Sequence, residues 1–236
     1  MISYLKADLF RIRQERLALF SCMLLVVIAV GVAYSFRKTP NQVIMIQIIN
    51  IITDFVTLFF LTPARIFFSD DYNYRTINNV VVKQQNRTLI IIYKLLVSFG
   101  LSLLFISLTY LLSALAFHLF TGQAYYGIVI DRMIKQLPFY IAIIALCQFL
   151  FNILRKTYQS ITAYILYVLL FDKVSATLAN HFFKLDISPV LMFKHLSLSL
   201  GDKHLSSTSI LVAFGLTLCY LLGNVFLFSK RELNKG

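Results

Sequence analysis

The chain has 236 residues, of which 59% are hydrophobic and 14% are charged, and its formal net charge is +12. Soluble domains carry roughly 25% charged residues, so this composition excludes an ordinary soluble domain and indicates a membrane protein. The positive charge does not indicate a nucleic-acid-binding protein, because Lys and Arg residues beside membrane spans set the orientation of the chain.

Residues 1–16 precede the first apolar segment and combine apolar side chains at helical spacing with basic ones. The apolar residues are Tyr4, Leu5, Leu9 and Ile12, and the basic residues are Lys6, Arg11, Arg13 and Arg16. This pattern predicts a helix that lies in the inner membrane interface and is attracted by anionic lipid. The alternative is an orientation signal without regular structure.

Six apolar segments follow, and they predict six transmembrane helices, since about 20 helical residues cross the ~30 Å hydrocarbon core of a bilayer. The predicted spans are residues 17–36, 39–64, 95–130, 136–154, 157–171 and 205–229. The fifth is the shortest and needs the charged residues at its two ends, whose long side chains can reach the headgroups. We therefore predict an all-α, polytopic membrane protein with a single transmembrane domain over residues 1–236.

Most of the 22 Lys and Arg residues fall on one side of the membrane in this layout. The connection 65–94 alone contains Arg65, Arg75, Lys83, Arg87 and Lys94. Because positively charged connections stay in the cytoplasm, both termini and this connection are predicted to be cytoplasmic. The connection 172–204 is then outside.

The second span carries the one clear charge inside an apolar segment, Asp54. It belongs to a polar stripe at steps of three or four residues, formed by Gln47, Asn50, Asp54 and Thr57. A central aspartate costs about 2.5–3.5 kcal/mol on insertion scales, so it should not face lipid. The stripe is predicted to line a hydrated substrate path or a subunit interface. The alternative is a set of hydrogen bonds that holds neighbouring helices together.

Other polar residues in the spans are smaller or more isolated. The third span has a stripe of Ser98, Ser102, Thr109 and Ser113. Small polar residues of this kind favour close helix packing over binding. Gln148 and Asn152 in the fourth span lie one turn apart, and the sequence leaves their role open.

The connection 65–94 contains a short amphipathic stretch. Tyr74, Ile77 and Val81 share one helical face, and the charges at its ends suit the helix dipole. Asp70 and Asp71 precede the stretch, and Lys83 follows it. Such a helix can lie on the bilayer or fill a groove on a partner protein.

The connection 172–204 is apolar enough for two short interfacial or re-entrant helices, over 174–183 and 189–200. His181, His195 and His204 lie in it without a ligand spacing on one helical face, so no metal site is predicted. The sequence also lacks the G-x-x-x-x-G-K-[ST], H-E-x-x-H and G-x-S-x-G motifs. We therefore predict no cofactor and no enzyme activity for this chain, and no ATP site of its own.

Three sequence runs share a further pattern with a known family. Residues 70–79 (DDYNYRTINN) are similar to an acidic residue followed by G-T-I-K-N, with Arg75 in place of the glycine and Asn78 in place of the basic residue. Residues 93–96 (YKLL) and 228–233 (FSKREL) are similar to the entry to span three and the exit from span six. With the basic amphipathic start, these runs resemble the ABC-2 type permease family, the membrane subunits of many bacterial ABC exporters.

The resemblance implies a coupling helix in the cytoplasmic connection that docks on a separate P-loop ATPase. The docking residues would be Asp70, Asp71, Tyr74, Arg75, Ile77, Val81 and Lys83. It also implies two ATPase copies that carry ATP and Mg, a second permease that is identical or homologous, and a bacterial cell membrane. Export of amphipathic peptides, or protection against them, is the expected function, and hydrophobic drugs or lipids are the alternative substrates. The rivals are an ion-coupled secondary transporter using Asp54 and a membrane-embedded enzyme that processes lipids or peptides.

Overall fold

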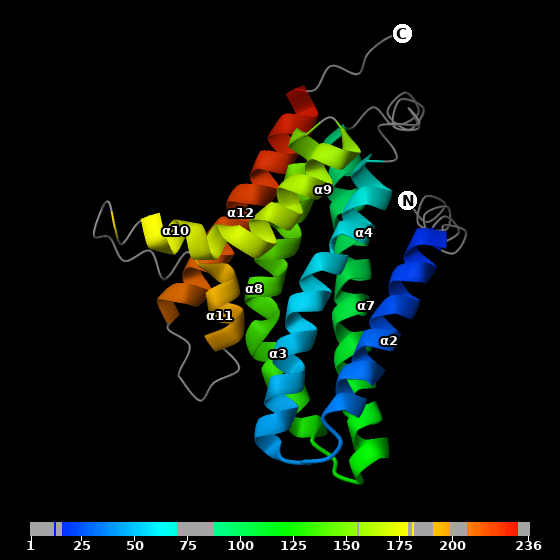
Figure 1. The fold of residues 1–236 in the computed structure, drawn as a ribbon. Coiled ribbons are helices and arrows are strands. Elements are labelled where there is room, and N and C mark those ends of the chain that lie inside the picture. The colour runs from blue at the N-terminus through cyan, green and yellow to red at the C-terminus, as the bar shows by residue number, and fades with distance from the viewer. Residues whose placement is uncertain are drawn as a thin grey trace.

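The computed structural model describes residues 12, 16–69, 87–154, 156–178, 181, 191–198 and 207–230. All regular structure in that part of the chain is helical (Figure 1). Five helical segments are long and apolar enough to cross a membrane: Arg16–Ser35, Gln42–Phe68, Leu89–Thr121, Tyr126–Ile153 and Ser207–Phe228. The prediction of an all-α chain with several helices able to span a membrane is therefore confirmed for the described residues, whereas the count of six spans stays a prediction. The predicted interfacial helix over 1–16 lies almost entirely outside the described residues.

The first two spans form a hairpin. Helix α2 (Arg16–Ser35) is followed by α3 (Gln42–Phe59), which begins where the Asn41 side chain accepts a hydrogen bond of 2.9 Å from Val43 N. The span continues through α4 (Leu61–Ala64) and the π-helical turn η1 (Arg65–Ser69). The buried residues of α2 are Ala18, Ser21, Leu25, Ala29 and Ala33. Because four of these are small, α2 can approach its neighbours closely.

The boundary predicted between the third and fourth spans is wrong. Helix α7 (Arg87–Thr121) ends at Gly122, whose φ of 72° suits glycine and whose N–H bonds to His118 O at 2.8 Å. Helix α8 (Tyr126–Ile153) begins soon afterwards. The charged residues 131–135, which the sequence suggested as the loop, lie inside α8. An ion pair of 2.7 Å between Lys135 and Asp131, four residues apart, helps a helix to carry them.

The connection predicted over 65–94 is shorter than the sequence suggested. Residues 65–69 extend the second span as η1, and residues 87–94 form the first turns of α7. Lys94 is buried inside the bundle, where its Nζ donates a hydrogen bond of 3.2 Å to Phe67 O. A cation at the C-terminal end of a helix is favourable because the carbonyl groups there carry partial negative charge. Residues 70–86 lie outside the described residues.

The last long helix, α12 (Ser207–Lys230), runs parallel to α8, because Phe149 contacts Tyr220 and Asn152 contacts Asn224. The chain between them must therefore return along the bundle. Helix α9 (Thr157–Leu166) and the π-helical turn η2 (Tyr167–Phe171) begin this return. Together they form an apolar segment shorter than the other five.

Two short helices lie in the stretch 172–204, α10 (Asp172–Leu178) and α11 (Met192–Leu198). Helix α10 extends away from the bundle (Figure 1). The two are joined where an Asp172 carboxylate oxygen accepts a hydrogen bond of 2.9 Å from Lys194 N in the first turn of α11. Burial raises the pKa of the Asp172 carboxyl, and the backbone N–H groups of Lys194 and Phe193 act in the opposite direction.

Candidate functional site

The polar stripe predicted on the second span divides between exposed and buried positions of α3. Gln47, Asn50 and Asp54 are exposed on the surface of the chain, whereas Thr57 is fully buried. The Thr57 hydroxyl donates a hydrogen bond of 2.8 Å to Asp54 O. Three members of the stripe therefore present amide and carboxylate groups to whatever surrounds the bundle. This exposure favours a path or an interface over helix packing within the chain.

The exposed faces of α7 and α12 carry mainly large apolar side chains, unlike the polar exposed positions of α3. The exposed large side chains of α7 are mostly leucines, among them Leu96, Leu104 and Leu119. Those of α12 are Leu211, Phe214, Leu218, Leu222 and Phe226. Such surfaces suit lipid, whereas an aspartate inside a membrane span is expensive against lipid and usually marks a functional position. The exposed face of α3 is therefore the candidate site.

A fully buried hydrogen-bond network lies directly behind this face. Tyr110 OH is 2.7 Å from Tyr140 OH and 2.8 Å from Thr53 Oγ1, and it donates to Gln136 Oε1. Gln136 Nε2 in turn donates to Leu196 O at 3.0 Å. Since Tyr110 gives its single proton to Gln136, Tyr140 must donate to Tyr110. The network thus links α3, α7, α8 and α11 through four polar side chains that are at most 3% exposed.

The network and the exposed stripe share one segment of α3. Thr53, which belongs to the network, immediately precedes Asp54, which belongs to the stripe. A shift of α3 at Asp54 would therefore also move Thr53 and its contact with Tyr110.

Helix α11 is held on α8 at two points. Gln136 bonds to the Leu196 carbonyl, and the imidazole ring of His195 stacks on Phe139 with a centroid distance of 5.4 Å and an interplanar angle of 18°. His195 is only 7% exposed. The histidine that sequence reasoning excluded as a metal ligand therefore contributes an aromatic contact.

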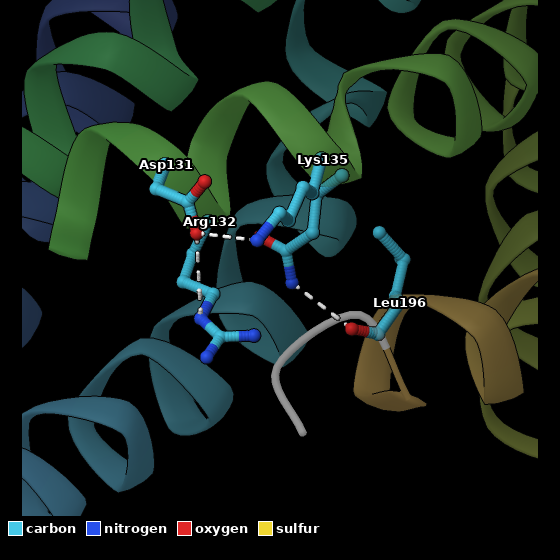
Figure 2. Close-up of polar contacts among 5 residues, drawn as sticks. Asp131, Arg132, Lys135 and Leu196 are labelled. Carbon is cyan, nitrogen blue, oxygen red and sulfur yellow. Dashed lines mark hydrogen bonds and ion pairs between the residues drawn. The ribbon is translucent and has the colours of Figure 1, made fainter. Parts of the chain in front are cut away.

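The N-terminal part of α8 concentrates charge beside this contact. Figure 2 shows Asp131 between Arg132 and Lys135, with Leu196 of α11 beside them. Arg132 is 7% exposed, and its Nε lies 3.9 Å from an Asp131 carboxylate oxygen. Among the described residues, no group of three His, Cys, Asp or Glu side chains is placed to hold a metal ion.

Sequence reasoning missed Tyr110, Gln136 and Tyr140. Each is a single polar residue on its own helix, so none forms a periodic stripe. Gln136 was also placed at the edge of a span, because the charges before it were interpreted as a loop. A tyrosine or glutamine well inside an apolar segment was the available signal, since such groups must find a hydrogen-bond partner.

The residues predicted to dock on an ATPase all lie outside the described residues. They are Asp70, Asp71, Tyr74, Arg75, Ile77, Val81 and Lys83. Their docking role therefore stays a prediction. Comparison of the sequence with models of known families found no match, and comparison with curated proteins found none either.

Proposed function

We propose that this chain is the membrane-spanning permease subunit of an ATP-driven ABC exporter in a bacterial cell membrane. It would act as a pair of permeases, identical or homologous, with two copies of a separate P-loop ATPase that carry ATP and Mg. The observation that carries the proposal furthest is the polar, exposed face of α3, Gln47, Asn50 and Asp54, on a bundle built from apolar membrane-length helices.

The exposed face supports a substrate path or a contact with the second permease. Lipid is a poor neighbour for Asp54, and hydrated cargo or the polar surface of another subunit is a better one. The buried network behind it would pass a change at this face to α7, α8 and α11. In this proposal α9 and η2 form the fifth of six membrane crossings, and both termini are cytoplasmic.

Coupling to ATP hydrolysis would use residues 70–85. The two ends of the described helices that flank this segment are tied together, because Lys94 Nζ of α7 bonds to Phe67 O of η1. A force on the segment would therefore act on the second and third spans as a unit. Amphipathic peptides are the proposed substrates, for export or for self-protection.

The partner ATPase provides the most direct test of this function. The tagged chain, purified from its native membrane in a mild detergent, should carry a stoichiometric P-loop ATPase that mass spectrometry identifies. Isolation of the chain without an ATPase, in a detergent that preserves a known exporter complex, would contradict the proposal. It would favour the second candidate, an ion-coupled transporter, for which the exposed Asp54 would be the ion site.

Asp54→Leu is expected to abolish export or permease pairing while leaving membrane insertion unchanged. The substitution removes the only charge of the stripe, so cargo or the second subunit loses its polar contact. Asn50→Leu at the neighbouring exposed position is the matched variant and should have a smaller effect, because an amide costs less than a carboxylate in lipid. Export per inserted molecule and crosslinking between subunits are the measurements. Normal export by Asp54→Leu at normal expression would reduce the stripe to a structural feature.

A further inference from the structure

Ser98 of α7, Gln148 of α8 and Asn224 of α12 are fully buried polar side chains with at least one atom that lacks a hydrogen-bond partner in the described part of the chain. Each has an exposed fraction of 0%. The atoms are Ser98 Oγ, both amide atoms of Gln148, and Asn224 Nδ2. Exchanging the nitrogen and oxygen of Gln148 changes nothing, because neither atom has a partner.

The three side chains lie at nearly one level of the bundle. Asn152 follows Gln148 by one turn on α8, and its Nδ2 donates to Asn224 O at 3.0 Å and to Asn224 Oδ1 at 3.2 Å. Asn224 is therefore about one helical pitch, ~5.4 Å, from the level of Gln148.

The register of the antiparallel helices α7 and α8 brings Ser98 to the same level of the bundle. Tyr110 of α7 bonds to Gln136 of α8. Ser98 precedes Tyr110 by as many residues as Gln148 follows Gln136, so both lie equally far from that bond. The helices α7, α8 and α12 also pack against one another in all three pairs. The unpartnered atoms therefore lie near one level of three mutually packed helices.

A buried polar group without a hydrogen-bond partner is unfavourable. Several such groups at one level indicate a shared partner that is not a protein atom. The set contains two amide donors, Gln148 Nε2 and Asn224 Nδ2, and one amide acceptor, Gln148 Oε1. The Ser98 hydroxyl can act as donor or acceptor. Water matches such a set, since buried waters usually make about three hydrogen bonds to otherwise unpaired groups. A metal cation would meet amide N–H groups, and an anion would meet the amide oxygen.

We propose that Ser98, Gln148 and Asn224 form an internal hydration site that holds ordered water between α7, α8 and α12. Hydrogen bonds through water can re-form after a small shift of one helix along another, whereas interdigitated apolar side chains must first separate. The site would therefore let α12 move along α8 without loss of packing. This inference concerns the bundle alone and does not depend on the proposed function.

The test is a double-mutant cycle on the purified full-length chain in detergent, with thermal unfolding as the measurement. If water links Ser98 and Gln148, Ser98→Ala should lower the Tm of the native chain. The same substitution should have little effect on the Tm of the Gln148→Leu variant. The expected departure from additivity is about 2–4 °C. Gln148→Met replaces Gln148→Leu if the leucine variant does not fold. Additive effects would overturn the proposal.

The matched control is Ser113→Ala, which removes a fully buried hydroxyl from the same helix. Ser113 Oγ donates to Tyr110 O at 2.8 Å and lies far from the proposed site along α7. Its effect should add to that of Gln148→Leu. An experimental structure that resolves ordered water should then show density bonded to Gln148. A direct hydrogen bond between Gln148 and Ser98 or Asn224, with no water, would overturn the proposal even if the cycle is non-additive.

Discussion

Gln136→Leu is expected to lower the free energy of unfolding by about 2–4 kcal/mol, because it removes the centre of a fully buried network. The leucine offers no acceptor to the Tyr110 hydroxyl and no donor to the Leu196 carbonyl, which Gln136 now satisfies. Leaving a buried donor or acceptor unpaired costs about 1–3 kcal/mol. For a chain of this size the loss corresponds to a fall in Tm of roughly 5–15 °C in thermal unfolding of the purified protein.

The same helix offers a matched control in Gln148→Leu. Gln148 is as deeply buried as Gln136, but the described protein atoms supply no partner to its amide. Replacing it breaks no direct protein–protein hydrogen bond and loses only the proposed water-mediated contacts, so a loss of about 1 kcal/mol, smaller than that of Gln136→Leu, is expected. Equal destabilisation by the two substitutions would show that the loss of a glutamine from α8 matters more than the network itself.

Ile77→Asp is expected to remove most of the ATPase from the purified complex and to abolish substrate-stimulated ATP hydrolysis. In the proposed function, Tyr74, Ile77 and Val81 form the apolar face that fills a groove on the ATPase. Buried apolar anchors dominate such interfaces, and a carboxylate placed in the groove would be desolvated without a partner. Co-purification in mild detergent and the ATPase rate are the measurements.

Lys83→Ala is the control for this interface. A charge at the rim tunes the rate of association more than the affinity, so the variant should keep nearly all of its ATPase. Membrane insertion of both variants is checked by extraction of the membranes at high pH. Full retention of the ATPase by Ile77→Asp would place the amphipathic stretch on the bilayer surface.

The membrane class and five of the helices followed from hydropathy, because each long apolar segment has one favourable environment. The boundary predicted near Ile130 did not follow from hydropathy. A span can carry charges such as Asp131 and Lys135 near its end when they pair along the helix. Gly122, with its positive φ, ends α7 instead. Lys94 was likewise placed in a loop, although a helix end supplies a buried carbonyl for its ammonium group.

The candidate site was predicted in part. Periodicity placed Gln47, Asn50, Asp54 and Thr57 on one side of the helix, and Thr57 lies only about 20° from Asn50 around the axis. Thr57 is nevertheless buried, because a distant part of the chain packs at its level: Tyr164 OH donates a hydrogen bond of 2.7 Å to Thr57 O. The network of Tyr110, Gln136 and Tyr140 depends on contacts between distant parts of the chain. Local patterns carry no information about such contacts.

The parallel pairing of α8 with α12 has a consequence for the order of biosynthesis. α12 is the most extensive neighbour of α8, yet the residues that separate them are synthesised first. At about 5–20 residues per second, the ribosome needs roughly 3–10 s to go from the end of α8 to the start of α12. During this interval Asn152 lacks the two hydrogen bonds that it makes to Asn224 in the complete chain. A chain truncated before Ser207 would lack the Asn152–Asn224 hydrogen bonds and would leave Phe149 and the rest of the α12-facing side of α8 uncovered, so membrane quality control should degrade it faster than the full chain.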